Sequence, residues 1–317
     1  MAKVLHVSTP SGHFRFMDSF YRQLLLAKSQ GKNISKMLRD DPSTGLSESE
    51  VIRYSYDLQA GSYIREYEED QSRFSAYANE LATVIATNCP SPVSVLDAGA
   101  GELISTRLIM EQLDPVFPFA VDGSLSRLHV GMKWLKDTQP SLASTMSVFV
   151  ANLDKLPFAP QSFDAVYTSH ALEPNHSNGA LLVSELWRIT SQDLFLFEPH
   201  YEAAGHKARE RMDYHGYIKN LEQTIIEQTG CKPAIFPIVN TVESYNPTFC
   251  FHIKRSTGLS PKQLDQKHRK PTFRMGNIAF DRVINGGICS SSDKICFPVI
   301  EDIPVFDEKL SIFLPSL

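Results

Sequence analysis

Two glycines and two aspartates are spaced along the chain as in a binding site for a ligand that contains a nucleoside. Gly99 and Gly101 follow a short apolar run that ends at Asp97. Glycine lets the backbone turn sharply and lets a ligand approach it closely. A second apolar run, residues 118–121, ends at Asp122, and a carboxylate at such a strand end can accept hydrogen bonds from both hydroxyls of a ribose. The pattern therefore indicates a ligand that lies against a glycine turn.

Three segments resemble sequence motifs of the class I S-adenosylmethionine (SAM)-dependent methyltransferases. The turn at residues 97–102, which reads D-A-G-A-G-E, resembles motif I of that family. Residues 151–158 (A-N-L-D-K-L-P-F) resemble the family segment D-A-x-x-L-P-F, with Asn152 where an aspartate is commoner. Residues 162–170 contain the F-D-x-V pattern of a strand that ends beside the methyl donor in the family. The order and spacing of these matches favour membership of the family over a tight turn that binds no ligand.

The resemblance implies SAM as the cofactor and suggests which residues contact it. In the family, the segment that matches residues 151–158 covers the adenine, and the side-chain carbonyl of Asn152 can accept from the adenine amino group. The cofactor candidates are Asp97, Gly99, Gly101, Asp122, Gly123, Asn152, Leu153 and Ser169. Residues 54–63 also resemble a Y-D-x-x-A-x-x-Y segment that packs over the cofactor, which adds Tyr56, Gln59 and Tyr63. Alternatively, these tyrosines only pack a helical cap onto the core.

Histidines and carboxylates near the later strand ends are candidates for handling the methyl acceptor. SAM carries an electrophilic methyl group, so the protein must hold a nucleophile about 3 Å from that carbon and supply a base when the acceptor is a hydroxyl. His170, His200 and His215 are base candidates because imidazole titrates near neutrality. Glu173 and Glu198 are the carboxylate alternatives, and each of the five could instead be a hydrogen-bonded structural residue. We favour His200 with Glu198 and keep His170 as a further catalytic candidate. The acceptor-binding candidates are Glu173, Asn175, Tyr201, Arg211, His215 and Tyr217.

The elements that must position these residues alternate along the chain. From residue 93 onward, strand-like runs are followed by segments with helical periodicity, which predicts a parallel sheet with helices on both faces. Ligands of such sheets bind at the carboxyl ends of the strands. We expect an α/β fold: a doubly wound, seven-stranded methyltransferase sheet with an N-terminal helical cap and a small C-terminal β-module. Residues 249–253 suit its last, antiparallel strand. The expected domains are the cap at 1–88, the SAM-binding core at 89–256, and a linker with the β-module at 257–317.

The end of the chain resembles a second kind of domain. Residues 297–306 (F-P-V-I-E-D-I-P-V-F) resemble the Y-P-I-x-D-G-I-P-V-L ending of small zinc-ribbon-derived domains that activate methyltransferases or are fused to them. A zinc ribbon needs two C-x-x-C knuckles to hold its metal, whereas this region contains only Cys289 and Cys296. We therefore expect a degenerate β-module without a metal, which packs on the core or on a partner subunit.

The amino-acid composition limits the classes of binding partner and the cellular compartment that we expect for this protein. The 317 residues carry a net charge of −5, with 42% hydrophobic and 21% charged residues, which is ordinary for a globular protein and gives no bulk attraction for nucleic acid. Five scattered cysteines fit a reducing cytoplasm better than a disulfide framework. The first nine residues lack the apolar stretch of a signal peptide. No run of about 18 apolar residues occurs, so no membrane span is expected.

Together these features predict a methyltransferase that acts on an oxygen or nitrogen of a small molecule, such as a sugar or secondary metabolite. No N-P-P-Y-type tetrapeptide follows residues 163–169, which argues against acceptors on bases or amide nitrogens. A tRNA or protein methyltransferase with a fused activator domain is one alternative. A non-catalytic subunit of the same fold that binds a partner is another. Each of these three functions is compatible with a homodimer.

Overall fold

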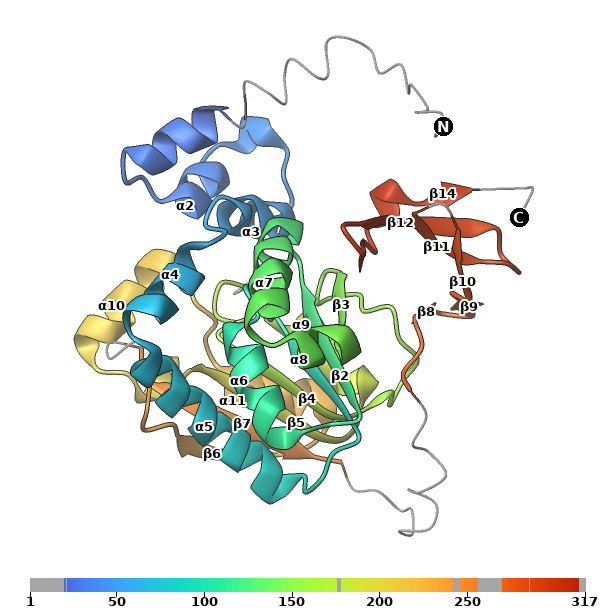
Figure 1. Cartoon of the computed structure of the whole chain (residues 1–317). Coiled ribbons are helices and arrows are strands. Elements are labelled where there is room, and N and C mark those ends of the chain that lie inside the picture. The colour runs from blue at the N-terminus through green and yellow to red at the C-terminus, as the bar shows by residue number, and fades with distance from the viewer. Residues whose placement is uncertain are drawn as a thin grey trace. The chain divides into compact units, whose positions relative to one another are not determined.

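The computed structural model describes residues 20, 22–175, 178–241, 246–255, 270–284 and 286–313 (Figure 1). Contacts divide the chain into two compact units, Met1–Gln59 and Ala60–Leu317. The domain boundaries expected after residues 88 and 256 remain predictions, and the second of them lies outside the described residues, as does most of the expected linker. Every helix among the described residues falls short of the length and apolarity that a membrane crossing requires.

The first unit is helical. Residues 22–29 form one helix, and the later elements are α2 (Ile34–Arg39), η1 (Pro42–Thr44) and α3 (Glu48–Asp57). Ser47 begins α3 with a capping box, because its hydroxyl accepts from the N–H of Glu50 and its own N–H donates to the Glu50 carboxylate. Leu24, Leu38 and Val51 form the small apolar core of this unit.

A seven-stranded sheet lies at the centre of the second unit. Its order is β3-β2-β1-β4-β5-β7-β6, and β7 runs antiparallel to both of its neighbours while the other pairs are parallel. The strands are β1 (Ser94–Ala98), β2 (Phe117–Asp122), β3 (Ser147–Val150), β4 (Phe163–Ser169), β5 (Thr190–Pro199), β6 (Ala234–Pro237) and β7 (Thr248–Lys254). The predicted doubly wound sheet, including its antiparallel strand at residues 249–253, is confirmed.

Helices cover both faces of this sheet, as the alternating pattern predicted. Leu128 of α7 packs with Phe195 in one apolar cluster, together with residues of α5 and α6. Leu186 of α9 packs with Leu194 in a second cluster, together with residues of α11. Neighbouring residues of β5 belong to different clusters because side chains alternate across a strand. The helices are α4 (Ser62–Glu69), α5 (Gln71–Asn88), α6 (Ile104–Leu113), α7 (Leu125–Thr138), α8 (Pro140–Thr145), α9 (Gly179–Ile189), η2 (Tyr201–Ala203), α10 (His206–His215) and α11 (Leu221–Thr229).

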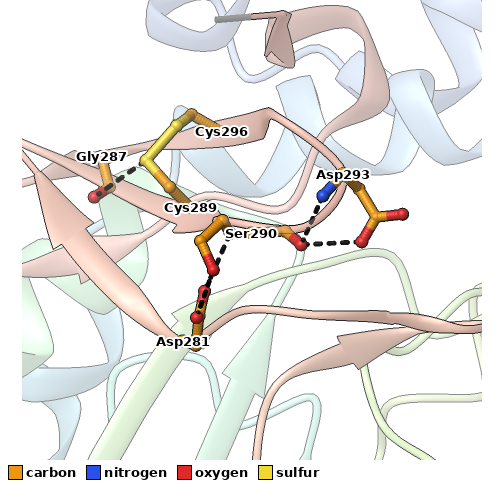
Figure 2. The surroundings of a disulfide bond; sticks show 7 residues. Asp281, Gly287, Cys289, Ser290, Asp293 and Cys296 are labelled. Atoms are coloured by element: carbon orange, nitrogen blue, oxygen red, sulfur yellow. Dashed lines mark hydrogen bonds between the residues drawn. A yellow bond between two sulfur atoms is a disulfide. The ribbon is translucent and has the colours of Figure 1, made fainter. Parts of the chain in front are cut away.

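Residues 270–284 and 286–313, called the C-terminal module below, are built from short antiparallel strands. They are β8 (Arg274–Met275), β9 (Ile278–Ala279), β10 (Arg282–Ile284), β11 (Gly287–Ser290), β12 (Ile295–Ile300), β13 (Ile303–Pro304) and β14 (Ile312–Phe313), with η3 (Glu308–Leu310) before the last. The expected β-module is confirmed. The cysteine count argued against a disulfide framework, yet one pair is bonded: the register of β11 and β12 places Cys289 opposite Cys296 (Figure 2).

Candidate active site

The turn that follows β1 is tight enough to require glycine. Gly99 has a φ of 96° and Gly101 a φ of 55°, in the region that favours glycine. A Cβ on Gly99 would lie 2.3 Å from the Cβ of Ala171, so no side chain fits there. Leu103 begins α6 with a φ of 63° although it is not a glycine. The backbone is therefore strained at the turn, as is common at functional sites.

Asp122 closes this turn from the end of β2. Its Oδ2 accepts a hydrogen bond from the backbone N of Gly101 at 2.9 Å, and its Oδ1 accepts one from the backbone N of Ser124 at 2.8 Å. The Ser124 hydroxyl caps α7 by accepting from the backbone N of Arg127 at 3.1 Å. Ser124 is therefore the cap of α7, and Asp122 is held beside the turn by two backbone N–H groups, while its role as a ribose ligand remains a prediction.

The loop after β3 lies beside the same two strand ends. A Cβ on Gly123 would lie 3.9 Å from Oδ1 of Asn152, and one on Gly99 would lie 3.9 Å from Cδ1 of Leu153. The structure thus gathers six of the residues predicted to bind the cofactor at one edge of the sheet: Gly99, Gly101, Asp122, Gly123, Asn152 and Leu153.

Asp97 supports the turn from inside the protein. Its side chain is buried, and its Oδ2 accepts hydrogen bonds from the hydroxyls of Thr106 at 2.7 Å and Tyr167 at 2.8 Å. Burial raises the pKa of Asp97 to about 7. These contacts hold the carboxylate between β1, β4 and α6, so any contribution of Asp97 to cofactor binding passes through the shape of the turn.

Glu102 and Arg127 belong to this site, although the sequence analysis did not single them out. The buried Glu102 carboxylate accepts from the backbone N of Gly61 and from that of Ile64, both at 2.9 Å, and so holds the start of α4. This helix carries Tyr63, whose ring centroid lies 5.0 Å from the Arg127 guanidinium. The same guanidinium lies 4.0 Å from Asp122. Both residues act across long sequence separations, which a local motif does not reveal.

The remaining cofactor candidates divide between the two units. Ser169 lies at the end of β4, and its hydroxyl is 2.8 Å from the hydroxyl of the buried Tyr77. Tyr56 and Gln59 lie in the first unit, so their contact with the cofactor remains a prediction.

His170 forms a pair with Glu173 directly beside the glycine turn. Its Nδ1 lies 2.8 Å from Oε2 of Glu173, and its Nε2 lies 3.0 Å from the hydroxyl of Thr248. The backbone of His170 has a φ of 55°. The next residue, Ala171, is the one that contacts Gly99. Of the histidines predicted as bases, His170 is therefore the one that the described contacts tie to the turn.

Glu198 and His200 are not joined by any described contact, although we expected them to act together. Glu198 is fully buried, and it accepts hydrogen bonds from three consecutive backbone N–H groups, residues 171–173, at 3.1 to 3.2 Å. Burial raises its pKa to about 7. His200 packs against the rings of Phe249 and Phe251 and lies 3.6 Å from Glu202, and burial lowers its pKa. Glu198 thus fixes the loop that follows His170.

Four of the six acceptor-binding candidates lie near one another, around Tyr217. Nη1 of Arg211 donates to the Tyr217 hydroxyl at 3.3 Å and to Oδ1 of Asn246 at 2.7 Å. Burial, and then the charge of Glu173, raise the pKa of Tyr217. The ring of His215 lies 5.9 Å from that of Tyr217. Arg211, Tyr217 and Glu173 therefore form a polar group next to His170.

The other two candidates have separate surroundings. Nδ2 of Asn175 donates to the carbonyl of Ala171 at 2.9 Å, which places it in the same loop as Glu173. Tyr201 belongs to a surface cluster, in which its hydroxyl donates to Asp213 at 3.2 Å and Nζ of Lys219 lies 4.5 Å from its ring centroid. No described contact joins Tyr201 to His170.

Comparisons with known proteins agree with this geometry. Residues 96–197 match the family model of the methyltransferase domain, while no curated protein matches the chain. The chain is similar to magnesium protoporphyrin IX methyltransferase from Synechocystis PCC 6803 with bound S-adenosylhomocysteine (SAH), at 13% identity and a TM-score of 0.51 over 66% of this chain and 100% of that one. It also resembles a chain from the Haloferax volcanii complex of the Trm112 methyltransferase activator with a methyltransferase, at 15% identity and a TM-score of 0.48 over 62% of this chain and 96% of that one.

A third match is geranyl diphosphate C-methyltransferase from Streptomyces coelicolor A3(2), at 12% identity and a TM-score of 0.44 over 55% of this chain and 78% of that one. The match to the Synechocystis enzyme shows a shared fold, and the domain match covers the strands β1 to β4 and most of β5, which carry the turn and His170. Together they indicate SAM as the cofactor. Residues 96–197 therefore match a methyltransferase domain, and the chain shares the fold of magnesium protoporphyrin IX methyltransferase.

Proposed function

We propose that the protein transfers a methyl group from SAM to an oxygen or nitrogen of a small-molecule acceptor, such as a sugar or secondary metabolite. The observation that carries this proposal is the contact between two parts of the site. Gly99 of the glycine turn lies against Ala171, and Ala171 follows His170. A ligand on the turn and a base at His170 would therefore face one reaction space at the carboxyl edge of the sheet.

The cofactor would lie along the strand ends. Asp122 would accept from the ribose hydroxyls, while the side-chain carbonyl of Asn152 would accept from the adenine amino group. The methionine part would lie beside the glycine turn, where Ala171 packs against Gly99 and the Arg127 guanidinium packs against Gly101. Tyr63 of α4 lies near this turn through its ring contact with Arg127. When bound, SAM supplies an electrophilic methyl group on a sulfonium.

His170 is the general base in this proposal, in place of the His200–Glu198 pair that the sequence favoured. Glu173 holds Nδ1 of the imidazole and would stabilise the imidazolium that forms when Nε2 exchanges its contact with the Thr248 hydroxyl for the acceptor proton. Glu198 keeps the loop at residues 171–173 in place through its three backbone hydrogen bonds. Arg211 and Tyr217 would contact polar groups of the acceptor.

Direct titration with SAM and SAH tests the cofactor part of the proposal. We expect micromolar binding to the wild type by isothermal calorimetry, and a loss of at least about 100-fold in Gly99→Ala, because the new methyl group would overlap Ala171. Gly230→Ala is the matched control, since Gly230 also has a positive φ, of 70°, but a Cβ there would meet nothing within 4 Å. Asp122→Ala should weaken binding. A wild type that binds neither ligand would contradict the proposal.

Turnover tests the acceptor class. Formation of SAH from SAM should rise with a pool of small polar metabolites and should not rise with tRNA or protein fractions. A rise with tRNA alone would replace this acceptor class with the nucleic-acid alternative. Binding of SAM without turnover on any acceptor would favour the non-catalytic subunit.

Compartment and assembly are separate proposals. The small number of cysteines favours a cytoplasmic location, whereas the Cys289–Cys296 disulfide favours an oxidising compartment. Thiols at both positions in cells would support the cytoplasm, and a disulfide there would contradict it. A homodimer is tested by light scattering of the purified protein.

A further inference from the structure

The C-terminal module contacts the loop proposed to cover the adenine. That loop, residues 151–158, leaves the end of β3 and is called the cofactor loop below. Val150, the last residue of β3, forms a parallel bridge with Val305, and its carbonyl accepts from the backbone N of Phe306 at 2.8 Å. β3 is the outermost strand of the sheet, so the module covers an edge that would otherwise present unpaired backbone groups.

The module also holds the far end of the cofactor loop. The backbone N of Arg274 donates to the carbonyl of Pro157 at 2.6 Å. Between the two ends, the ammonium of Lys155 forms an ion pair with the carboxylate of Glu308. The loop is thus tied to the module at its start, in its middle and near its last residue.

Aromatic rings fill the space between the module and the loop. Phe273 lies 5.3 Å from Phe158 of the loop and 5.1 Å from Phe149 of β3, measured between ring centroids. Phe306 lies 4.8 Å from Phe273 and 6.2 Å from Phe149. Such ring pairs stabilise a contact beyond the apolar area that they bury, so this contact restricts the conformation of a short loop.

Helix α9 holds the loop independently of the module. The backbone N of Leu156 donates to Glu185, and Arg188 donates to the carbonyl of Phe158 at 2.7 Å. These bonds reach only the second half of the loop. Asn152 and Leu153, which carry the proposed adenine contacts, lie between Val150 and Lys155, both of which contact the module.

We propose that the C-terminal module is a built-in brace for the cofactor loop, with Phe273 and Phe306 as positioning residues that set the affinity for SAM without touching it. The inference rests on the proposed cofactor site. It assigns the module an intramolecular role in place of recruitment of a partner.

The test compares two aromatic residues of the module. Phe273→Ala removes the ring that contacts Phe158, whereas Phe280→Ala removes a ring whose described ring contacts, to Phe297 and Phe306, stay within the module. Phe273→Ala should raise the dissociation constant of SAM about tenfold and should speed amide exchange across residues 151–158 in the cofactor-free protein. Phe280→Ala should leave the affinity for SAM within about twofold and should leave exchange of the loop unchanged.

Two results would overturn the brace. One is an equal loss of SAM affinity in both variants, which would indicate general destabilisation, and the other is wild-type exchange of the loop in Phe273→Ala. If Phe273→Ala does not fold, Phe273→Leu replaces it, because leucine keeps the site apolar but loses the ring contact with Phe158. A wild type that fails to bind SAM would end the proposed function, while exchange of the loop in the cofactor-free variants would still decide whether the module positions it.

Discussion

The two ends of the central sheet use the same residue types for different purposes. At the amino ends of β1 and β4, near the start of β5, Asp193 lies 2.7 Å from Nε2 of His252. That imidazole stacks on Phe195 at 4.6 Å, and Nζ of Lys254 lies 3.7 Å from the same carboxylate. At the carboxyl ends, His170 and Glu173 form a pair of nearly the same length, 2.8 Å.

What distinguishes the two pairs is their surroundings. Asp193 is buried and lies near the imidazole of His252 and the ammonium of Lys254, which suits a structural contact that holds β5 to β7. The loop of His170 packs against the glycine turn, where Gly99 allows the close approach of Ala171, and this turn is the proposed cofactor site. A contact between a histidine and a carboxylate is therefore not sufficient evidence of an active site. The position of the pair relative to a proposed ligand site is also needed to assign it a catalytic role.

The largest effect that separates the two pairs should be on turnover. His170→Asn should lower kcat by about 10²- to 10⁴-fold, because the base is lost, while the dissociation constant of SAM stays within about twofold. His252→Asn should leave kcat at the wild-type value. Initial rates of SAH formation with the acceptor found by screening measure both. Equal losses in the two variants would remove the distinction.

The reverse asymmetry should appear in stability. Asp193→Ala leaves the imidazole of His252 and the ammonium of Lys254 without their shared carboxylate, so it should lower the free energy of unfolding by roughly 3 kcal/mol. Glu173→Ala should cost less, because the Glu173 carboxylate is less deeply buried than that of Asp193 and water can replace it at His170. Urea unfolding followed by circular dichroism gives both values. A smaller cost for Asp193→Ala than for Glu173→Ala would show that the structural pair has been misassigned.

The carboxyl edge should also give stability a dependence on pH. The pKa values of Asp97 and Glu198 are both raised to about 7 from ordinary values of 3.8 and 4.5, so between pH 4.5 and 7 the folded chain binds more protons than the unfolded chain. The free energy of unfolding should therefore fall as the pH rises through this window, by up to about 1.4 kcal/mol per pH unit for each group. Glu198→Gln should flatten this slope in unfolding experiments at pH 5, 6 and 7. An unchanged slope would mean that Glu198 does not titrate there.

The smallest expected effect compares two carboxylates that bind backbone amides. Glu102 holds the start of α4 at the site edge, whereas Asp164 accepts from the backbone N of Val93 and Ser94 at the other edge. Glu102→Gln and Asp164→Asn should each lower the free energy of unfolding by about 1–2 kcal/mol. Only Glu102→Gln should also weaken SAM binding, by about threefold, because α4 carries Tyr63. Titration calorimetry on both variants separates these outcomes.

The sequence was sufficient to predict the central sheet and the edge of that sheet at which the candidate site residues lie. Glycines at positive φ, strand ends with polar residues and the alternation of strands with helices are local signals, and they correctly placed Gly99, Asp122 and Asn152 at the same edge. The antiparallel strand at residues 249–253 was also recognisable, because it is the last apolar run of the core.

The direction of individual side chains was beyond the sequence. Glu198 and His200 both lie at the end of β5, but their side chains have different partners. The Glu198 carboxylate accepts hydrogen bonds from the backbone of residues 171–173, whereas the His200 ring packs on Phe249. The position of a residue at a strand end predicts the edge of the sheet at which it lies. The partner of its side chain depends on loops that are far away in the chain. The Cys289–Cys296 disulfide was hidden for the same reason, since it depends on the register of two strands that the spacing alone does not fix.

The aromatic rings described above have a consequence for how the protein melts. They run in unbroken contact from Phe119 of β2 through Phe158 and Phe273 to Phe306 of the C-terminal module. Loss of the module would expose rings of the central sheet, so we expect the sheet and the module to unfold together. Residues Ala60–Leu317 form one compact unit, and scanning calorimetry should show a single endotherm for it, with van't Hoff and calorimetric enthalpies that agree. The methyltransferase domain match ends at residue 197, but this compact unit continues over a hundred residues further.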